Sequence, residues 1–322
     1  MAEKTKSAGA LKAKSSTASV FIDGEAGTTG LQIAERLQGL SGIALRSIDP
    51  KHRKDPAARA DLMSDCDLVI LCLPDDAAND AVALADSLGN NAPKIIDAST
   101  AHRVAPGWVY GFAELDGRQT DLIRKATRVA NPGCYPTGAI ALIRPLVDAG
   151  LVPPDYPITV NAVSGYSGGG KSMIESYEVS KTAPPFELYG LGLEHKHVPE
   201  LMAYGHLVRR PIFVPSAGNF RQGMLVSVPL HLDMLPGKPE LKDLEAALAK
   251  HYAGCDRVRV VPDAASLTRL EPEALNNTDK LELFVLGKTA LGHALLVARL
   301  DNLGKGAAGA AVQNLQLMLG LP

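Results

Sequence analysis

The chain has 322 residues, with 33 Lys and Arg against 35 Asp and Glu, a formal net charge of −2, and 46% hydrophobic residues. This composition is typical of a soluble globular enzyme or binding protein that is long enough for two domains. It argues against a nucleic-acid binder, which needs a concentrated cationic surface. Small neutral or anionic molecules are the better candidate ligands. No apolar run approaches the roughly 20 residues that cross a bilayer, so we expect no membrane contact and a cytoplasmic location.

The first 17 residues, 1–17, are rich in small residues and lysine and show no apolar periodicity. Such a segment buries too little surface to offset the entropy of ordering, so we expect a disordered tail. A transit peptide is the competing interpretation, but it usually carries arginine, and this stretch has none.

From residue 18 onward, short apolar runs alternate with helix-period stretches, which is typical of a parallel sheet with crossover helices. The run at 67–73 is almost continuously apolar, as expected of a strand buried on both faces. The pattern therefore predicts an α/β domain of the Rossmann type, with a doubly wound parallel sheet. Its strands are expected at 20–23, 43–48, 68–73, 94–97 and 128–130, with a helix at 76–88.

Beyond about residue 150 the apolar runs are longer and are separated by Gly- and Pro-rich connections, which predicts a second, α+β domain with a mostly antiparallel sheet. Its strands are expected at 158–163, 224–231, 281–287 and 294–300, with one helix at 240–250. The last segment, 305–319, is predicted to be a helix that folds back onto the first domain. We therefore expect a dinucleotide-binding domain at 18–132 plus 303–322 and a catalytic, substrate-binding domain at 133–302.

A glycine-rich turn follows the first predicted strand. It reads GEAGTTG and contains Gly24, Gly27, Thr28, Thr29 and Gly30. Glycines between a strand and a helix let the backbone approach a pyrophosphate, whose charge is met by amides at the helix N-terminus. Because the spacing is GxxGxxG and not GxGxxG, an ordinary glycine-rich turn is the competing interpretation.

The end of the second predicted strand carries both cations and one acid, in the order RSIDPKHRK from Arg46. An acid there favours a free ribose hydroxyl, whereas cations favour a 2′-phosphate. The cations outnumber Asp49, so we expect NADP(H) as the cofactor, with Arg46, Ser47 and Arg53 as phosphate contacts. A solvated charged loop is the alternative for any one of them.

The four cysteines, at 66, 72, 134 and 255, form no Cys-x-x-Cys pair, so neither a zinc centre nor a disulfide framework is indicated. Cys134 has a different setting from the others, in NPGCYPTG. Pro132-Gly133 forces a turn after a strand, and Pro136 suits the first turn of a helix. Helix amides stabilise a thiolate and lower its pKa, so Cys134 is the candidate nucleophile; a buried structural cysteine is the alternative.

A thiolate nucleophile needs a general acid/base, for which an imidazole is suited at neutral pH. The candidates are His195 and His197 in the sequence EHKHVPE. In an extended segment the two rings would lie on one side, so a metal site is the alternative. No third ligand of obvious spacing accompanies them, and we expect no metal.

Two further segments resemble anion sites. DASTAHR, containing Ser99 and Arg103, follows a predicted strand end, where open α/β sheets bind ligands. Arg103 can clamp a carboxylate or phosphate, or can simply close a surface loop. The glycine-rich stretch SGYSGGGK contributes Ser164, Gly165 and Lys171 as candidate substrate contacts.

These motifs, together with the near-terminal DNLGKGAAGAAVQN, occur in the order found in the N-acetyl-gamma-glutamyl-phosphate reductase family. The chain resembles the shorter branch of that family, whose first motif reads GEAGTTG. Aspartate-semialdehyde dehydrogenase belongs to the same broader group. The resemblance covers nearly everything after residue 18.

The resemblance implies NADPH-dependent reduction of N-acetyl-L-glutamyl 5-phosphate to N-acetyl-L-glutamate 5-semialdehyde with release of phosphate, in arginine biosynthesis. It implies Cys134 as the nucleophile, His197 as the acid/base with His195 as partner or rival, and Asn302 beside the nicotinamide. Where the longer branch has arginine after its glycine-rich loop, this chain has Lys171, which cannot bind bidentately.

We expect a small acyl-phosphate substrate and an oligomer, either a homodimer or a homotetramer. The alternatives are an aspartate-semialdehyde dehydrogenase, whose substrate carries a free amine, and a non-catalytic NADP-binding regulator.

Overall fold

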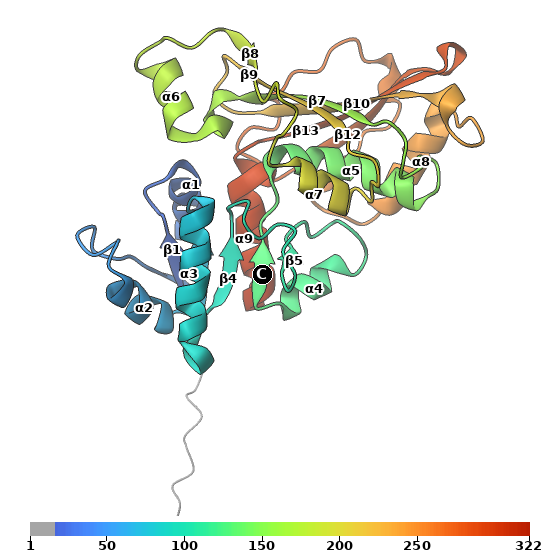
Figure 1. Cartoon of the computed structure of the whole chain (residues 1–322). Helices are drawn as coiled ribbons and strands as arrows, with labels where there is room; N and C mark the ends of the chain where they lie inside the picture. The colour runs from blue at the N-terminus through green and yellow to red at the C-terminus, as the bar shows by residue number, and fades with distance from the viewer. Residues whose placement is uncertain (1–16) are drawn as a thin grey trace, which may run out of the picture.

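The computed structural model describes residues 17–322 and shows two units, each built on one sheet (Figure 1). The predicted tail at 1–17 lies outside the described residues apart from Thr17. Among residues 17–322, no helix is long and apolar enough to cross a membrane.

The first unit contains a six-stranded sheet in which every neighbouring pair is parallel. Its third strand is buried along its whole length, which explains why its sequence is apolar without alternation. The strand order is β2 (Ile43–Arg46), β1 (Ala18–Asp23), β3 (Leu68–Leu71), β4 (Lys94–Asp97), β6 (Arg128–Ala130) and β5 (Val109–Tyr110).

Helices cover both faces of this sheet, as the doubly wound prediction requires. One face packs against α1 (Thr28–Gln38), α4 (Gln119–Lys125) and α9 (Gly309–Leu319). The opposite face packs against α2 (Pro56–Ser64) and α3 (Asp75–Ser87). The C-terminal helix α9 therefore returns to the first unit after the chain has built the second, as Figure 1 shows.

The second unit contains a seven-stranded mixed sheet. Four of its neighbouring strand pairs are antiparallel, while β7 with β9 and β11 with β12 are parallel. The strand order is β11 (Val258–Val260), β12 (Leu281–Lys288), β13 (His293–Leu300), β10 (Met224–His231), β7 (Thr159–Gly165), β9 (Ile212–Gly218) and β8 (Phe186–Leu188).

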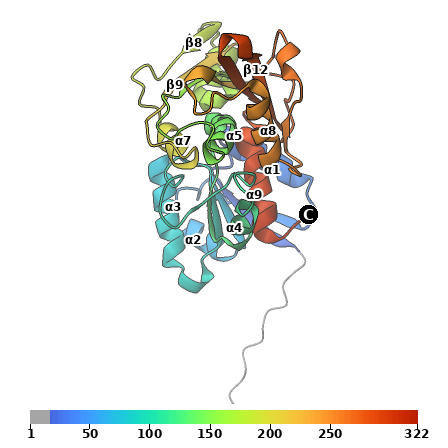
Figure 2. The ribbon, with the colours of Figure 1, turned by 90° about the vertical axis from the view of Figure 1, so that its right-hand side faces the viewer.

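One face of this second sheet packs against α5 (Cys134–Asp148), α7 (Val198–Tyr204) and α8 (Leu241–His251). These three helices lie between the second sheet and the first unit (Figure 2). The N-terminal end of α5 follows directly from β6, so the chain passes from the parallel sheet into the second unit at Cys134. The remaining α-helix, α6 (Gly170–Glu178), follows a 3-10 turn at Tyr166–Gly169.

Several predicted boundaries differ from the structure for local reasons. The second strand was expected to reach residue 48 but ends at Arg46, shortly before Asp49-Pro50. The predicted C-terminal helix begins as a π-turn over Gly304–Ala308, before α9. The expected extended conformation at the two histidines is wrong: β8 ends at Leu188, and His197 has helical backbone angles as the N-cap of α7.

Candidate active site

A cleft of about 640 Å³ lies between the two units, at the carboxyl ends of the parallel strands. This is where open α/β sheets bind ligands. Segments from both units line it. They are Thr28–Thr29, Leu73–Asp75, Ala98–Thr100 with Arg103, Asn131–Tyr135, Ser167–Gly170 with Met173, Tyr189, His195–His197, Asn302–Leu303 and Gly306–Ala307.

The glycine turn is shaped for close backbone approach. Gly24 has φ +94°, and a Cβ there or at Gly30 would collide with neighbouring backbone atoms. The nearest atom to a Cβ at Gly27 would be 3.4 Å away, so this position has space. Gly27 is the N-cap of α1, whose first residues, Thr28 and Thr29, line the cleft. These residues fit a dinucleotide pyrophosphate at the helix N-terminus.

The predicted 2′-phosphate contacts lie on the surface at the end of β2. Arg46, Ser47 and Arg53 are exposed. The Ser47 hydroxyl donates a 3.0 Å hydrogen bond to the Glu25 carboxylate, so the glycine turn and the end of β2 are in direct contact. Glu25 was not selected from the sequence, although it stands inside the glycine-rich motif.

The loop after β4 is held by a buried carboxylate. Asp97 accepts hydrogen bonds from the Ser99 amide at 2.8 Å and the Ser99 hydroxyl at 2.7 Å, and lies 2.6 Å from Nδ1 of His102. The His102 ring stacks on Trp108. Ser99 therefore lines the cleft with its hydroxyl already engaged, and it supports the loop that carries Arg103.

Cys134 is the first residue of α5, as the sequence predicted, and it lines the cleft together with Thr28 and Thr29 of the glycine turn. The expected lowering of its pKa is wrong. Burial raises the pKa of the Cys134 thiol to about 11, while Arg103 and helix backbone amides act in the opposite direction. Desolvation outweighs the helix N-terminus because the thiolate loses more hydration than two amides and one neighbouring cation restore.

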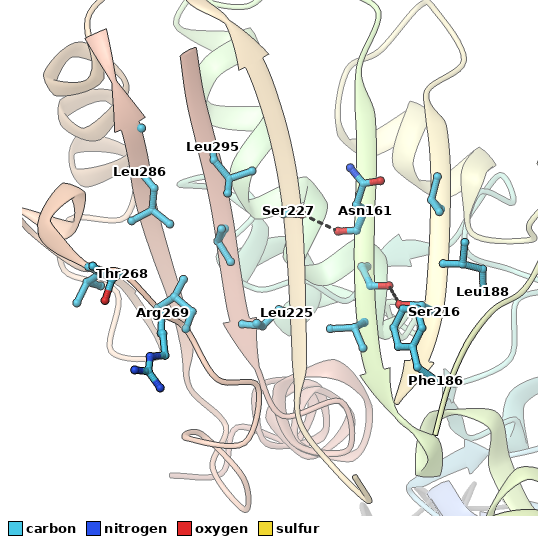
Figure 3. A pocket seen from close by; sticks show the side chains of 17 residues that line it. Asn161, Phe186, Leu188, Ser216, Leu225, Ser227, Thr268, Arg269, Leu286 and Leu295 are labelled. Carbon is cyan, nitrogen blue, oxygen red and sulfur yellow. Dashed lines mark hydrogen bonds between the residues drawn. The ribbon is translucent and has the colours of Figure 1, made fainter. Parts of the chain in front are cut away.

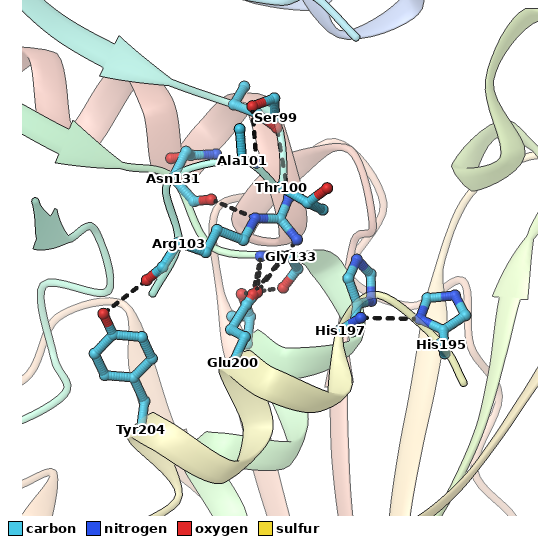
Figure 4. Close-up of polar contacts among 12 residues, drawn as sticks. Ser99, Thr100, Ala101, Arg103, Asn131, Gly133, His195, His197, Glu200 and Tyr204 are labelled. Carbon is cyan, nitrogen blue, oxygen red and sulfur yellow. Dashed lines mark hydrogen bonds and ion pairs between the residues drawn. The ribbon is translucent and has the colours of Figure 1, made fainter. Parts of the chain in front are cut away.

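Both histidines of the HKH motif line the cleft. Burial lowers the pKa of His197 well below its ordinary value, with Arg103 and His195 acting in the same direction, so its imidazole is neutral at pH 7. Nδ1 of this ring is buried and finds no hydrogen-bond partner among the described residues. Burial also lowers the pKa of His195, whose Nδ1 accepts the His197 amide at 3.2 Å (Figure 4).

Only some of the residues predicted to contact the substrate or the nicotinamide line the cleft. Asn302 lines the cleft, but its side chain already donates to Ser167 at 3.0 Å and accepts the Gly223 amide at 2.8 Å. Arg103 also lines it. Ser164 and Gly165 are buried, and Lys171 is exposed; none of the three belongs to the lining formed by the described residues.

The structure adds residues that sequence reasoning missed. Lys196 lies between the two histidines and lines the cleft, whereas Lys171 does not. Among the described residues that line the cleft, Asp75 is the only acid. Its carboxylate accepts the amide and hydroxyl of Thr100, and these bonds with Lys196 and Arg103 outweigh burial and lower its pKa. The only available signal for Lys196 was its position inside the histidine motif.

Within residues 17–322, no group of three or more His, Cys, Asp or Glu side chains is arranged to hold a metal ion.

Two family descriptions match the chain, one over most of the first unit and one over the second. Residues 17–123 match the description "Semialdehyde dehydrogenase, NAD binding domain", and residues 134–302 match "Semialdehyde dehydrogenase, dimerisation domain". A Sinorhizobium fredii protein named N-acetyl-gamma-glutamyl-phosphate reductase is 56% identical over 304 residues, covering 93% of this chain and 98% of its own. A Brucella ovis protein of the same name is 56% identical over 308 residues, covering 94% and 98%.

Solved structures of aspartate semialdehyde dehydrogenases share the fold. The Vibrio cholerae enzyme II has a TM-score of 0.69 at 16% identity, covering 95% of this chain and 99% of its own. The Candida albicans enzyme, solved with NADP, has a TM-score of 0.65 at 14% identity, covering 94% and 99%.

Proposed function

This chain belongs to the N-acetyl-gamma-glutamyl-phosphate reductase family, and we propose that it catalyses the NADPH-dependent reduction of N-acetyl-L-glutamyl 5-phosphate. The products are N-acetyl-L-glutamate 5-semialdehyde and phosphate, and the step belongs to arginine biosynthesis. The observation that carries this proposal is 56% identity to the curated relatives across 93% of the chain. The cleft adds Cys134 in one cavity with Thr28 and Thr29, which follow the glycine turn at the start of α1.

In the proposed reaction, the sulfur of Cys134 attacks the acyl carbon, and the bond from that carbon to the phosphate oxygen breaks. Phosphate leaves with the bonding electrons, and a thioester remains on Cys134. NADPH supplies the hydride when it is bound. The resulting thiohemiacetal collapses, the carbon–sulfur bond breaks, and the aldehyde is released with Cys134 regenerated. A free carboxylate resists hydride, but the acyl phosphate is an activated form that transfers its acyl group to sulfur, and the carbonyl of the resulting thioester is electrophilic enough to accept hydride.

The substrate-free thiol is protonated at pH 7, so its proton must be removed as the sulfur attacks. We assign this to His197, which is neutral and able to accept a proton, with His195 holding its backbone. Backbone amides at the start of α5 stabilise the tetrahedral oxyanion, a contribution of ~3 kcal/mol for one donor. Arg103 and Lys196 supply positive charge for the phosphate.

The cleft also bears on the alternative substrate. An aspartate-semialdehyde substrate carries an ammonium group that needs an acidic partner, whereas an acetylated amine does not. Asp75, the only acid in the described lining, is already engaged by Thr100. This favours the acetylated substrate.

The test is phosphate-dependent reduction of NADP⁺ in the reverse direction, with N-acetyl-glutamate semialdehyde and aspartate semialdehyde as rival substrates. We expect turnover with the acetylated compound and none after Cys134→Ser. Activity only with the aspartate compound would overturn the substrate. NADPH binding without turnover on either compound would favour a non-catalytic regulator.

We propose that the protein is a homodimer, or a homotetramer of such dimers, joined through the outer face of the second sheet. That face holds a shallow apolar cavity of about 690 Å³, lined in part by Phe186, Leu188 and Leu295, whose side chains are exposed (Figure 3). The match of 134–302 to a dimerisation domain supports this assignment. Leu295→Asp should give a monomer by light scattering, because it places a charge on the buried face.

The division at 18–132 plus 303–322 and 133–302 remains our proposed domain boundary, supported by the packing of α9 on α1 and α4. We also propose a cytoplasmic location. The four cysteines form no disulfide with one another, as is usual for proteins of a reducing compartment.

A further inference from the structure

Glu200 is a buried acid that the proposed reaction does not use. It lies on α7 with 1% of its surface exposed, and it is absent from the described lining of the cleft. An isolated buried carboxylate is costly, so its retention requires partners that compensate for lost hydration. Those partners lead directly to the reacting cysteine.

The first partner is the turn that carries Cys134. The Gly133 amide donates to both Glu200 oxygens, at 2.9 and 3.1 Å. Gly133 is the N-cap of α5, and Cys134 is the next residue. A Cβ at Gly133 would lie 2.5 Å from an Arg103 nitrogen, 2.8 Å from His197 Nε2 and 3.0 Å from Glu200 Oε1. Three side chains thus converge on the residue before the nucleophile.

The second partner is Arg103. Its Nη1 donates to the Glu200 oxygens at 3.2 and 3.4 Å, and its Nε donates to the Asn131 carbonyl at 3.1 Å (Figure 4). The Arg103 carbonyl accepts the Tyr204 hydroxyl at 2.7 Å, and Tyr204 lies on the same helix as Glu200. Helix α7 therefore holds Arg103 by both its side chain and its backbone.

The place of Arg103 indicates which substrate group it meets. Phosphate is bonded to the carbon that sulfur attacks, whereas the substrate carboxylate is at the far end of the chain. Because Arg103 lies against Gly133, beside Cys134, the group within its reach is the phosphate. A guanidinium directs its donors along fixed lines, so its orientation decides whether it can bind that anion.

We propose that Glu200 is a positioning residue that orients Arg103 for the phosphate group while fixing the turn before Cys134. It does not activate the thiol by charge: Glu200 raises the pKa of Cys134, and Arg103 lowers it. This inference rests on the proposed reductase function.

The test is the phosphate KM in the reverse reaction, compared between wild type and Glu200→Gln. A glutamine has one acceptor oxygen, so it can keep the hydrogen bond from the immobile Gly133 amide but loses the hydrogen bond from Arg103. We expect the phosphate KM to rise about tenfold or more, with the NADP⁺ dissociation constant unchanged. Glu200→Asp keeps the carboxylate, so its phosphate KM should be closer to that of the wild type. Glu273→Gln, at an exposed position, is the matched control and should not change the phosphate KM.

A purely structural role predicts fewer active molecules with an unchanged phosphate KM, and that result would overturn the inference. So would equal losses in Glu200→Asp and Glu200→Gln, or full additivity of Glu200→Gln with Arg103→Lys, because Glu200 acts through Arg103. If wild type shows no phosphate-dependent turnover at all, the reductase assignment itself fails, which is a distinct outcome.

Discussion

Gly306 packs against Cys134: a Cβ at position 306 would stand 2.9 Å from the Cβ of the cysteine and 3.3 Å from its Cα. The glycine belongs to the π-turn at Gly304–Ala308, which joins the second unit to α9. The C-terminal segment therefore forms part of the cleft wall beside Cys134, and the absence of a side chain at Gly306 allows this close approach.

Gly306→Ala is expected to displace Cys134 or the π-turn by a few tenths of an ångström or more. Misplacement of reacting groups by about 1 Å costs on the order of 10²-fold in rate, so we expect a loss of turnover of up to that size. The measurement is kcat in the reverse assay. Gly117→Ala is the control, because nothing lies within 4 Å of a Cβ there. Equal activity of the two variants would contradict this close packing.

Alkylation of substrate-free enzyme should report the protonation of Cys134. Burial raises the pKa of this thiol to about 11, so the thiolate fraction should grow about tenfold per pH unit from 7 to 10. Labelling of Cys134 by iodoacetamide, followed by mass spectrometry, measures this. Arg103→Met should slow the labelling, because the cation favours the thiolate. A rate that already levels off below pH 8 would show that the helix N-terminus dominates over burial.

A buried ion pair formed by Lys305 of the π-turn should control stability. Nζ of Lys305 lies 2.5 Å from the Glu114 carboxylate, with 1% and 8% of the two side chains exposed, and Gln313 bonds to both. Burial alone would raise the pKa of Glu114, but Lys305 and Gln313 reverse this and lower it. Lys305→Met would leave an unpaired buried carboxylate.

We expect Lys305→Met to reduce the free energy of unfolding by ~3–5 kcal/mol, measured by urea denaturation. The double variant Lys305→Met/Glu114→Met should be closer to wild type, since no buried charge is left alone. Arg124→Met, which breaks the exposed pair with Asp121, should cost less than ~1 kcal/mol. If the single and double variants lose equal stability, the charge on Glu114 is not the cause.

Glu25 should weaken the binding of a 2′-phosphate. Its carboxylate accepts the hydroxyl of Ser47, which we expect beside that phosphate, and like charges near 4 Å repel by ~1 kcal/mol in water. Glu25→Gln should therefore lower the dissociation constant of NADP⁺ about fivefold and change that of NAD⁺ by less than about twofold, as measured by calorimetry. Glu35→Gln, at an exposed position on α1, is the matched control. Parallel changes for both nucleotides would place Glu25 away from the 2′ position.

The fold class and the place of Cys134 at the start of a helix could be predicted because both depend on residues that are close together in the sequence. Short apolar runs with intervening helical stretches correctly predicted the bounds of β4 and β6 and the start of β3, which ends at Leu71 and not at residue 73. The Pro-Gly-Cys-Tyr-Pro sequence correctly placed Cys134 at a helix start. Strands whose apolar residues are interrupted, such as β9 with Pro215, were missed. The extended geometry considered for the two histidines was wrong: His197 is the N-cap of α7, and Pro199 and Glu200 in the first turn are a local helix-start signal that the prediction did not use.

By itself, the sequence determined the two-unit architecture, the glycine turn and the identity of the candidate nucleophile, since each depends on residues close together in the chain. Only the tertiary structure decided the pKa of Cys134, the ion pair between Glu200 and Arg103, the close packing of Gly306 and the presence of Lys196 in the cleft. The physical reason is that desolvation, ion pairing and steric contact depend on which distant segments surround a group, and no spacing along the chain encodes that neighbourhood.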